Sequence, residues 1–182
     1  MNVAYYLSCS DDDSYMLPKK SDGLVCSKCG AVTAKDYLNP RFKPKKRKLD
    51  LVNTYDGYYI ASERFRLFCE ESDYSGLEFV QLPASPSYFW FKVQNIVRFN
   101  LTTRTSSTEF CELCQRHRSV GGFPYGKKFL ADTKEPLADG FYRTDIEMGY
   151  RDLSPLLIVG PETKNKIVAR KLHGLCFDEI LA

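Results

Sequence analysis

Hydrophobic and polar positions alternate most clearly in residues 87–101, which read Ser-Tyr-Phe-Trp-Phe-Lys-Val-Gln-Asn-Ile-Val-Arg-Phe-Asn-Leu. This alternation is typical of a half-buried strand, and it breaks at Asn95 and Ile96, where a β-bulge would fit. We therefore expect a long strand or a bent hairpin arm here. Its buried face is expected to consist of Phe89, Phe91, Val93, Val97, Phe99 and Leu101.

Two further segments, 58–82 and 156–180, align with each other without a gap. Both show a short apolar strand, a helix start, about ten helical residues, a glycine and a second short strand. This shared order predicts an internal repeat. The identical pairs are Ile60 and Ile158, Gly76 and Gly174, Leu77 and Leu175, and Phe79 and Phe177.

Each repeat has its own helix signals. In the first, Ser62 is a suitable N-cap, and the predicted buried face is Phe65, Phe68 and Cys69. In the second, Pro161 suits the first helical position and Gly174 a left-handed end. Its predicted buried face is Ile167, Val168 and Leu172.

These elements predict an α+β fold in a single domain, residues 1–182. Two pseudo-repeated strand-helix-strand units, about 58–82 and 156–180, would contribute to a mixed, largely antiparallel sheet. The strand order stays open, because the short strand-helix-strand connections allow parallel crossovers while the long aromatic strand favours antiparallel pairing.

Two short cysteine motifs precede the repeats, one before each. The first, at 26–29, reads Cys26-Ser-Lys-Cys29 and is followed by Gly30, and the second, at 111–114, reads Cys111-Glu-Leu-Cys114. Four thiolates fill the tetrahedral shell of one Zn²⁺, so Cys26, Cys29, Cys111 and Cys114 are predicted to hold a structural zinc that joins the two halves. The gap between the motifs is much longer than in zinc ribbons.

Other uses of these cysteines remain open. They could be two unrelated pairs, either buried free thiols or a redox dithiol. His117, three positions after Cys114, could replace one cysteine as a ligand, although a position beside the site is the simpler interpretation. The remaining cysteines that we considered, Cys69 and Cys176, fit ordinary buried positions.

Composition sets broad limits. The chain has 182 residues with 43% hydrophobic content, which is enough for one sizeable core. No apolar run is long enough to span a membrane, and residues 1–13 lack the pattern of a signal peptide, so a cytoplasmic protein is expected. Seven cysteines, four of them in metal-type spacing, favour a reducing compartment.

Charge is informative only locally, because 26 basic and 23 acidic side chains leave a net charge of +3. Residues 40–48 form a basic segment, with Pro40 and Pro44 breaking regular structure, and a solvated linker is the favoured interpretation. The alternative is a phosphate-contacting patch, with Tyr88 or Trp90 as stacking residues if they are exposed. Neighbouring segments covering both rings is the simpler expectation.

The sequence gives no sign of a catalytic set. Four cysteine ligands leave no open metal position for water or substrate, and neither His117 nor His173 accompanies a recognisable nucleophile motif. The acidic run Asp11-Asp12-Asp13 is interpreted as a solvated turn rather than a cation site. We therefore do not expect an enzyme.

The two distant Cys-x-x-Cys motifs, the Ser62-Glu-Arg helix start after a short strand, and the repeated Gly-Leu-x-Phe strands resemble the double-CXXCG-motif family of bacterial immunity proteins. The resemblance covers about residues 24–181, and the chain departs from the motif at Gln115, where the family has glycine. It implies a non-catalytic cytoplasmic protein that binds and neutralises a cognate toxin, with Cys26, Cys29, Cys111 and Cys114 as the metal ligands. The competing hypothesis is a zinc-ribbon module that binds nucleic acid or regulates another protein. Neither hypothesis involves a membrane, nucleic acid is the less expected partner, and the oligomeric state is open.

Overall fold

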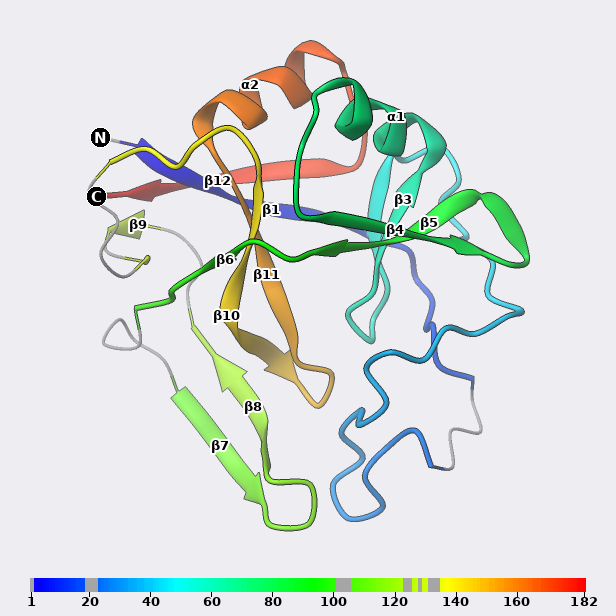
Figure 1. Cartoon of the computed structure of the whole chain (residues 1–182). Coiled ribbons are helices and arrows are strands. Elements are labelled where there is room, and N and C mark those ends of the chain that lie inside the picture. The colour runs from blue at the N-terminus through cyan, green and yellow to red at the C-terminus, as the bar shows by residue number, and fades with distance from the viewer. Residues whose placement is uncertain (1, 19–22, 101–105, 123–125, 128, 131–134) are drawn as a thin grey trace.

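The computed structural model describes the whole chain except residues 1, 19–22, 101–105, 123–125, 128 and 131–134. The chain builds a large mixed sheet, with two short helices side by side over one face (Figure 1). None of the described helices has the length and apolar character needed to cross a membrane. In chain order the elements are β1 (Asn2–Asp11), β2 (Leu51–Asn53), β3 (Tyr59–Ser62), α1 (Glu63–Glu71), β4 (Leu77–Leu82), β5 (Ser85–Val93), β6 (Ile96–Val97), β7 (Ser106–Cys111), β8 (Arg116–Gly121), β9 (Gly126–Lys127), β10 (Phe141–Tyr150), β11 (Ser154–Val159), α2 (Pro161–Ala169) and β12 (Leu175–Leu181).

The expected α+β fold is wrong, because 11% of the described residues are helical and 45% are in strands. The two helices do lie between strands along the chain, but those strands do not pair with each other. Strand β5 lies between β3 and β4, and β1 lies between β11 and β12. Each strand-helix-strand segment therefore needs a third strand to complete its pairing, and the large sheet rather than a strand-helix-strand repeat organises the fold.

Strand β1 is the centre of the sheet, and the sequence pattern did not reveal it. It pairs with β12 along most of its length, with β11 at residues 5–7, and in parallel with β2 at residues 10–11. Neighbouring residues Val3 and Ala4 are both buried, as is Leu7. A strand covered on both faces shows no polar alternation, which explains the omission.

The long aromatic strand is confirmed in its main features. Strand β5 ends at Val93, β6 follows at Ile96, and the break falls at the expected place. The expected inward positions Phe89, Phe91, Val93, Val97 and Phe99 are buried. Leu101 lies outside the described residues.

The first helix is also confirmed. The Ser62 hydroxyl accepts a hydrogen bond from the Phe65 amide, and the buried side chains of α1 are Phe65, Phe68 and Cys69. In α2, Pro161 occupies the first turn and Ile167 is buried, but Val168 is 54% exposed, so its place on the buried face was wrong. Lys171, not Gly174, takes the left-handed position directly after α2, with φ +53°.

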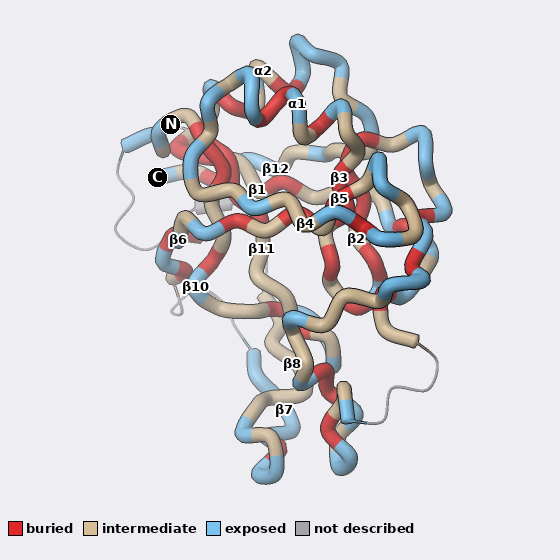
Figure 2. Tube along the Cα trace, turned by 45° about the vertical axis from the view of Figure 1, so that its right-hand side comes forward, coloured by how far each residue is buried: buried red, intermediate tan, exposed pale blue. Residues whose placement is uncertain are grey.

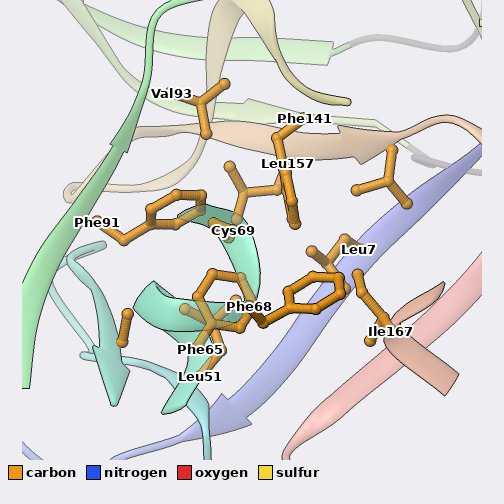
Figure 3. Packing of buried hydrophobic residues seen from close by; sticks show 12 residues of the cluster. Leu7, Leu51, Phe65, Phe68, Cys69, Phe91, Val93, Phe141, Leu157 and Ile167 are labelled. Atoms are coloured by element: carbon orange, nitrogen blue, oxygen red, sulfur yellow. The ribbon is translucent and has the colours of Figure 1, made fainter. Parts of the chain in front are cut away.

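The main core lies between the helices and the sheet, as Figure 3 shows for Phe65 and Phe68 of α1 against Phe91 and Phe141 of the strands. The Phe65 ring meets both strand rings edge to face, with centroids 5.3 and 5.7 Å away. Below this body, the β7–β8 hairpin and the segment that contains Cys26 project together (Figure 2). The body therefore carries a separate arm, and the arm holds the cysteines.

Candidate metal centre

The first knuckle, residues 24–33, is a small hairpin. Val25 and Val32 form an antiparallel bridge, and the Cys26 amide donates to the Ala31 carbonyl at 2.8 Å. Gly30, with φ +74°, turns the chain so that its amide donates to the Cys26 carbonyl at 2.8 Å. The left-handed φ suits glycine because the residue has no Cβ.

The second knuckle, residues 111–115, lies at the turn of the β7–β8 hairpin, where Cys111 pairs with Arg116. The Gln115 amide donates to the Cys111 carbonyl at 2.8 Å, and Gln115 has φ +56°. Its side-chain amide donates to the Glu112 carbonyl at 2.6 Å. The residue that departs from the family pattern therefore makes the same backbone hydrogen bond as Gly30.

The four cysteines come together across the knuckles. Their Sγ atoms all lie within 4.8 Å of one another, with Cys26 and Cys111 3.8 Å apart and Cys29 and Cys114 3.7 Å apart. A tetrahedral ion with metal–sulfur distances of about 2.3 Å has sulfur–sulfur edges of about 3.8 Å. The spacing is therefore close enough for all four cysteines to bind one metal ion.

The backbone of each knuckle favours the thiolate form of its first cysteine. The Cys114 amide, helped by that of Leu113, lowers the pKa of Cys111 to about 6. The Cys29 amide, helped by that of Lys28, also lowers the pKa of Cys26. Burial raises the pKa of Cys114 to about 12. Since metals bind thiolates, the knuckle amides prepare one strong ligand in each half.

Contacts outside the sulfur atoms also join the knuckles. The Arg116 guanidinium donates to the Val32 carbonyl at 3.2 Å, which links β8 to the first hairpin. Lys28 and Glu112, the variable positions of the two motifs, approach to 3.9 Å. The role of Arg116 could not be predicted from the sequence, because a basic residue on a strand carries no distinctive signal.

His117 is not part of the cysteine cluster in the described part of the chain. It pairs across the hairpin with Phe110, and the two rings meet at 5.2 Å. Since neighbouring residues of a strand point to opposite faces, this contact places His117 on the face away from Cys111. His117 therefore lies beside the site, in line with the simpler interpretation.

The other residues considered from sequence lie elsewhere. Tyr88 and Trp90 are half-buried, the Tyr88 hydroxyl donates to the Arg47 carbonyl, and the Trp90 ring contacts the Tyr58 ring. Neighbouring segments thus cover much of both side chains, as the simpler expectation held. Cys69 is buried as expected, whereas Cys176 is exposed.

The acidic run 11–13 is not a solvated turn, because Asp12 is fully buried. Its carboxylate accepts hydrogen bonds from the amides of Lys45 and Lys46 and from Ser14. Lys46 also forms a 2.9 Å ion pair with Asp13. The acidic run therefore holds the basic segment against the body.

Comparisons with known proteins add nothing to these observations. A scan against models of protein families found no match to this chain, and a search of curated proteins found none either.

Proposed function

We propose that this chain is a non-catalytic immunity protein that binds and neutralises a cognate bacterial toxin in the cytoplasm, with a structural Zn²⁺ held by Cys26, Cys29, Cys111 and Cys114. The resemblance to the double-CXXCG-motif family, carried by the motifs of the sequence, supports the toxin-binding role. The four-cysteine cluster supports the structural metal.

The main support for the structural metal is the cluster of four sulfur atoms. Thiolates in tetrahedral spacing are the donor set that Zn²⁺ prefers in structural sites. Four protein ligands leave no open position at which a zinc-bound water could react, so the ion would stabilise the arm rather than catalyse a reaction.

The contacts of the basic segment weigh against the nucleic-acid alternative. Lys45 and Lys46 already contact Asp12 and Asp13, and Asp13 neutralises the Lys46 ammonium. A phosphate-binding patch needs basic groups that are free to replace counterions. The Lys46 ammonium therefore has an acidic partner within the chain, and the Lys45 ammonium donates to the backbone carbonyl of Asp13.

Co-expression with the toxin encoded beside this protein's gene tests the proposal. The wild-type chain and Cys176→Ser are expected to restore growth of cells that express the toxin, because Cys176 lies outside the cluster. Cys26→Ser combined with Cys111→Ser is expected to abolish protection, because the arm loses its metal. Persistent toxicity in cells that contain folded wild-type protein would contradict the toxin-neutralising role.

A further inference from the structure

A cleft of about 190 Å³ opens where the sheet divides, away from the four cysteines. Strand β1 pairs with β11 up to Leu7 and with β2 from Ser10 onward, so β3 and β5 diverge from β10 and β11. The cleft lies between these two parts, and Lys35 from the chain after the first knuckle also lines it. The volume is below the roughly 300–1,000 Å³ of clefts that hold cofactors and drug-sized ligands. A group about the size of one large side chain fits this space better.

Two contacts between the walls hold the cleft open at a defined width. A Cβ on Gly57 would lie 2.8 Å from the Ser154 Cβ, so the absence of a side chain at Gly57 allows the walls to meet there. The Tyr59 hydroxyl donates a hydrogen bond to the Pro155 carbonyl at 3.2 Å. Because both contacts come from residues that line the cleft, the space is formed before any ligand arrives.

One wall is aromatic and contains a hydroxyl without a partner. The rings of Tyr58 and Trp90 lie 5.0 Å apart, and Tyr58 is only 4% exposed. Its hydroxyl makes no hydrogen bond within the described residues. Burial raises the pKa of Tyr58, which keeps the hydroxyl protonated as a donor. A buried donor without an acceptor is costly, and a ligand acceptor would relieve that cost.

The charged groups of the cleft leave one cation without an acidic partner. Lys35 lies 3.4 Å from Glu147, and Lys92 lies 3.6 Å from Asp36. The Asp56 carboxylate accepts hydrogen bonds from the amides of Met16 and Leu17. The Arg143 guanidinium donates only to the Thr144 carbonyl, at 3.4 Å, among the side-chain interactions of the described residues.

We propose that this cleft binds a carboxylate carried on a flat apolar group, with Arg143 and the Tyr58 hydroxyl contacting the carboxylate and the Trp90 ring contacting the apolar part. The guanidinium offers paired donors that match a carboxylate, and the aromatic wall supplies apolar area. The same chemistry is found in a free aromatic acid and in an aromatic residue next to an acidic one in a partner chain. This binding site does not depend on the toxin-neutralising role.

Trp90 is the one tryptophan of the chain, so intrinsic tryptophan fluorescence reports directly on the cleft. The metal-loaded full-length protein is titrated with 3-phenylpropionate and, in parallel, with the neutral 3-phenylpropanamide. A third titration uses the peptide N-acetyl-Phe-Asp-amide. We expect a saturable change with the acid and at least tenfold weaker binding of the amide. Tighter binding of the peptide assigns the cleft to a partner chain, and tighter binding of the free acid assigns it to a small molecule.

Substitutions test the contributions of the Arg143 charge and the Tyr58 hydroxyl to binding separately. Arg143→Gln is expected to weaken binding of the acid at least tenfold and to leave binding of the amide unchanged. Tyr58→Phe is expected to weaken binding severalfold without loss of thermal stability, because the hydroxyl it removes has no partner. The matched control is Arg98→Gln, an exposed arginine outside the cleft, which is expected to bind like the wild type.

Equal affinities for the acid and the amide would overturn the proposal. So would an unchanged affinity in Arg143→Gln, or the absence of any saturable fluorescence change with the acid and the peptide. If Arg143→Gln fails to fold, Arg143→Lys replaces it, because lysine keeps the charge but lacks the paired donors. Arg143→Lys is expected to bind the acid more weakly than the wild type does. The double variant Tyr58→Phe with Arg143→Lys is expected to bind the acid more weakly still. Equal affinities of the wild type and Arg143→Lys for the acid would then contradict the role of Arg143.

Discussion

Gly30 and Gln115 occupy the same position in the two knuckles, directly after the second cysteine, although one has no side chain and the other has a long polar one. Both residues have left-handed φ values, and both donate from the amide to the carbonyl of the first cysteine at 2.8 Å. The knuckle geometry therefore comes from the hydrogen bond around the sulfur cluster, and glycine lowers its cost without being required for it. The two knuckles have the same backbone hydrogen bond and differ in backbone strain.

Removing a cysteine should have the largest effect, and it should be the same in both knuckles. Cys26 and Cys111 are 85 positions apart, and closing a loop of that length corresponds to about 4 to 5 kcal/mol of unfolded-chain entropy in the cross-link model. We expect Cys26→Ser and Cys111→Ser each to abolish binding of one equivalent of zinc and to lower the melting temperature strongly. A chelator should do the same to the wild type.

A variant that lacks both Cys26 and Cys111 tests whether the two knuckles share one ion. If one ion joins the knuckles, Cys26→Ser combined with Cys111→Ser should be no less stable than either single variant, because the first substitution already removes the link. Metal content and thermal melts measure this directly. Additive losses, or a wild-type protein without metal and with an unchanged melt after chelation, would mean that the knuckles act separately.

Acid should release the metal from both knuckles together. The folded protein lowers the pKa of Cys111 to about 6 and also lowers that of Cys26, both mainly through knuckle amides. A lowered thiol pKa contributes stability above the unfolded value of about 8.5, and this contribution is lost as the pH falls through the folded value. Protons also compete with the metal for the thiolates. We expect little release between pH 8 and 7 and cooperative release near pH 6 and below, measured with a metal indicator. Release in two separate steps would show that the knuckles do not share an ion.

The cysteine cluster and the fold differed in how well the sequence predicted them. The ligand set depends on four residues in two short motifs, so a local pattern sufficed to identify cysteines that the fold brings together. The sheet depends on β1, which has buried residues on both faces and no clear period, and on its pairing with strands from the other end of the chain. Local patterns identified α1 and β5 but could not show that β5 lies between β3 and β4. The cleft at Arg143 could not be predicted from the sequence either, because it forms only where two parts of the sheet that are distant in the chain diverge.

Substituting the residue after the second cysteine should affect the two knuckles unequally. Gly30→Ala introduces a Cβ with no atom within 4 Å, so its cost is that of the left-handed backbone, about 1 kcal/mol. Gln115→Gly removes the same strain but also loses the side-chain hydrogen bond to Glu112, and the more flexible unfolded chain offsets part of the gain. We expect a net change of at most about 0.5 kcal/mol from the difference of these terms. Urea unfolding of the metal-loaded proteins measures both. Equal losses in the two variants would contradict the assignment of strain to Gln115.

The smallest effect should come from the ion pair that spans the knuckles. Lys28 and Glu112 lie 3.9 Å apart, with side chains 61% and 85% exposed, so solvent screens their attraction. A double-mutant cycle with Lys28→Ala and Glu112→Ala should give a coupling of about 0 to 0.5 kcal/mol, decreasing further with added salt. Lys28 also lies beside a cluster that would carry net negative charge with Zn²⁺ bound, since four thiolates exceed the charge of one divalent ion. For this reason Lys28→Ala alone should weaken metal binding slightly, whereas Glu112→Ala alone should not weaken it. A coupling above about 1 kcal/mol would mean that side-chain charge, and not the shared ion, contributes much of the contact between the knuckles.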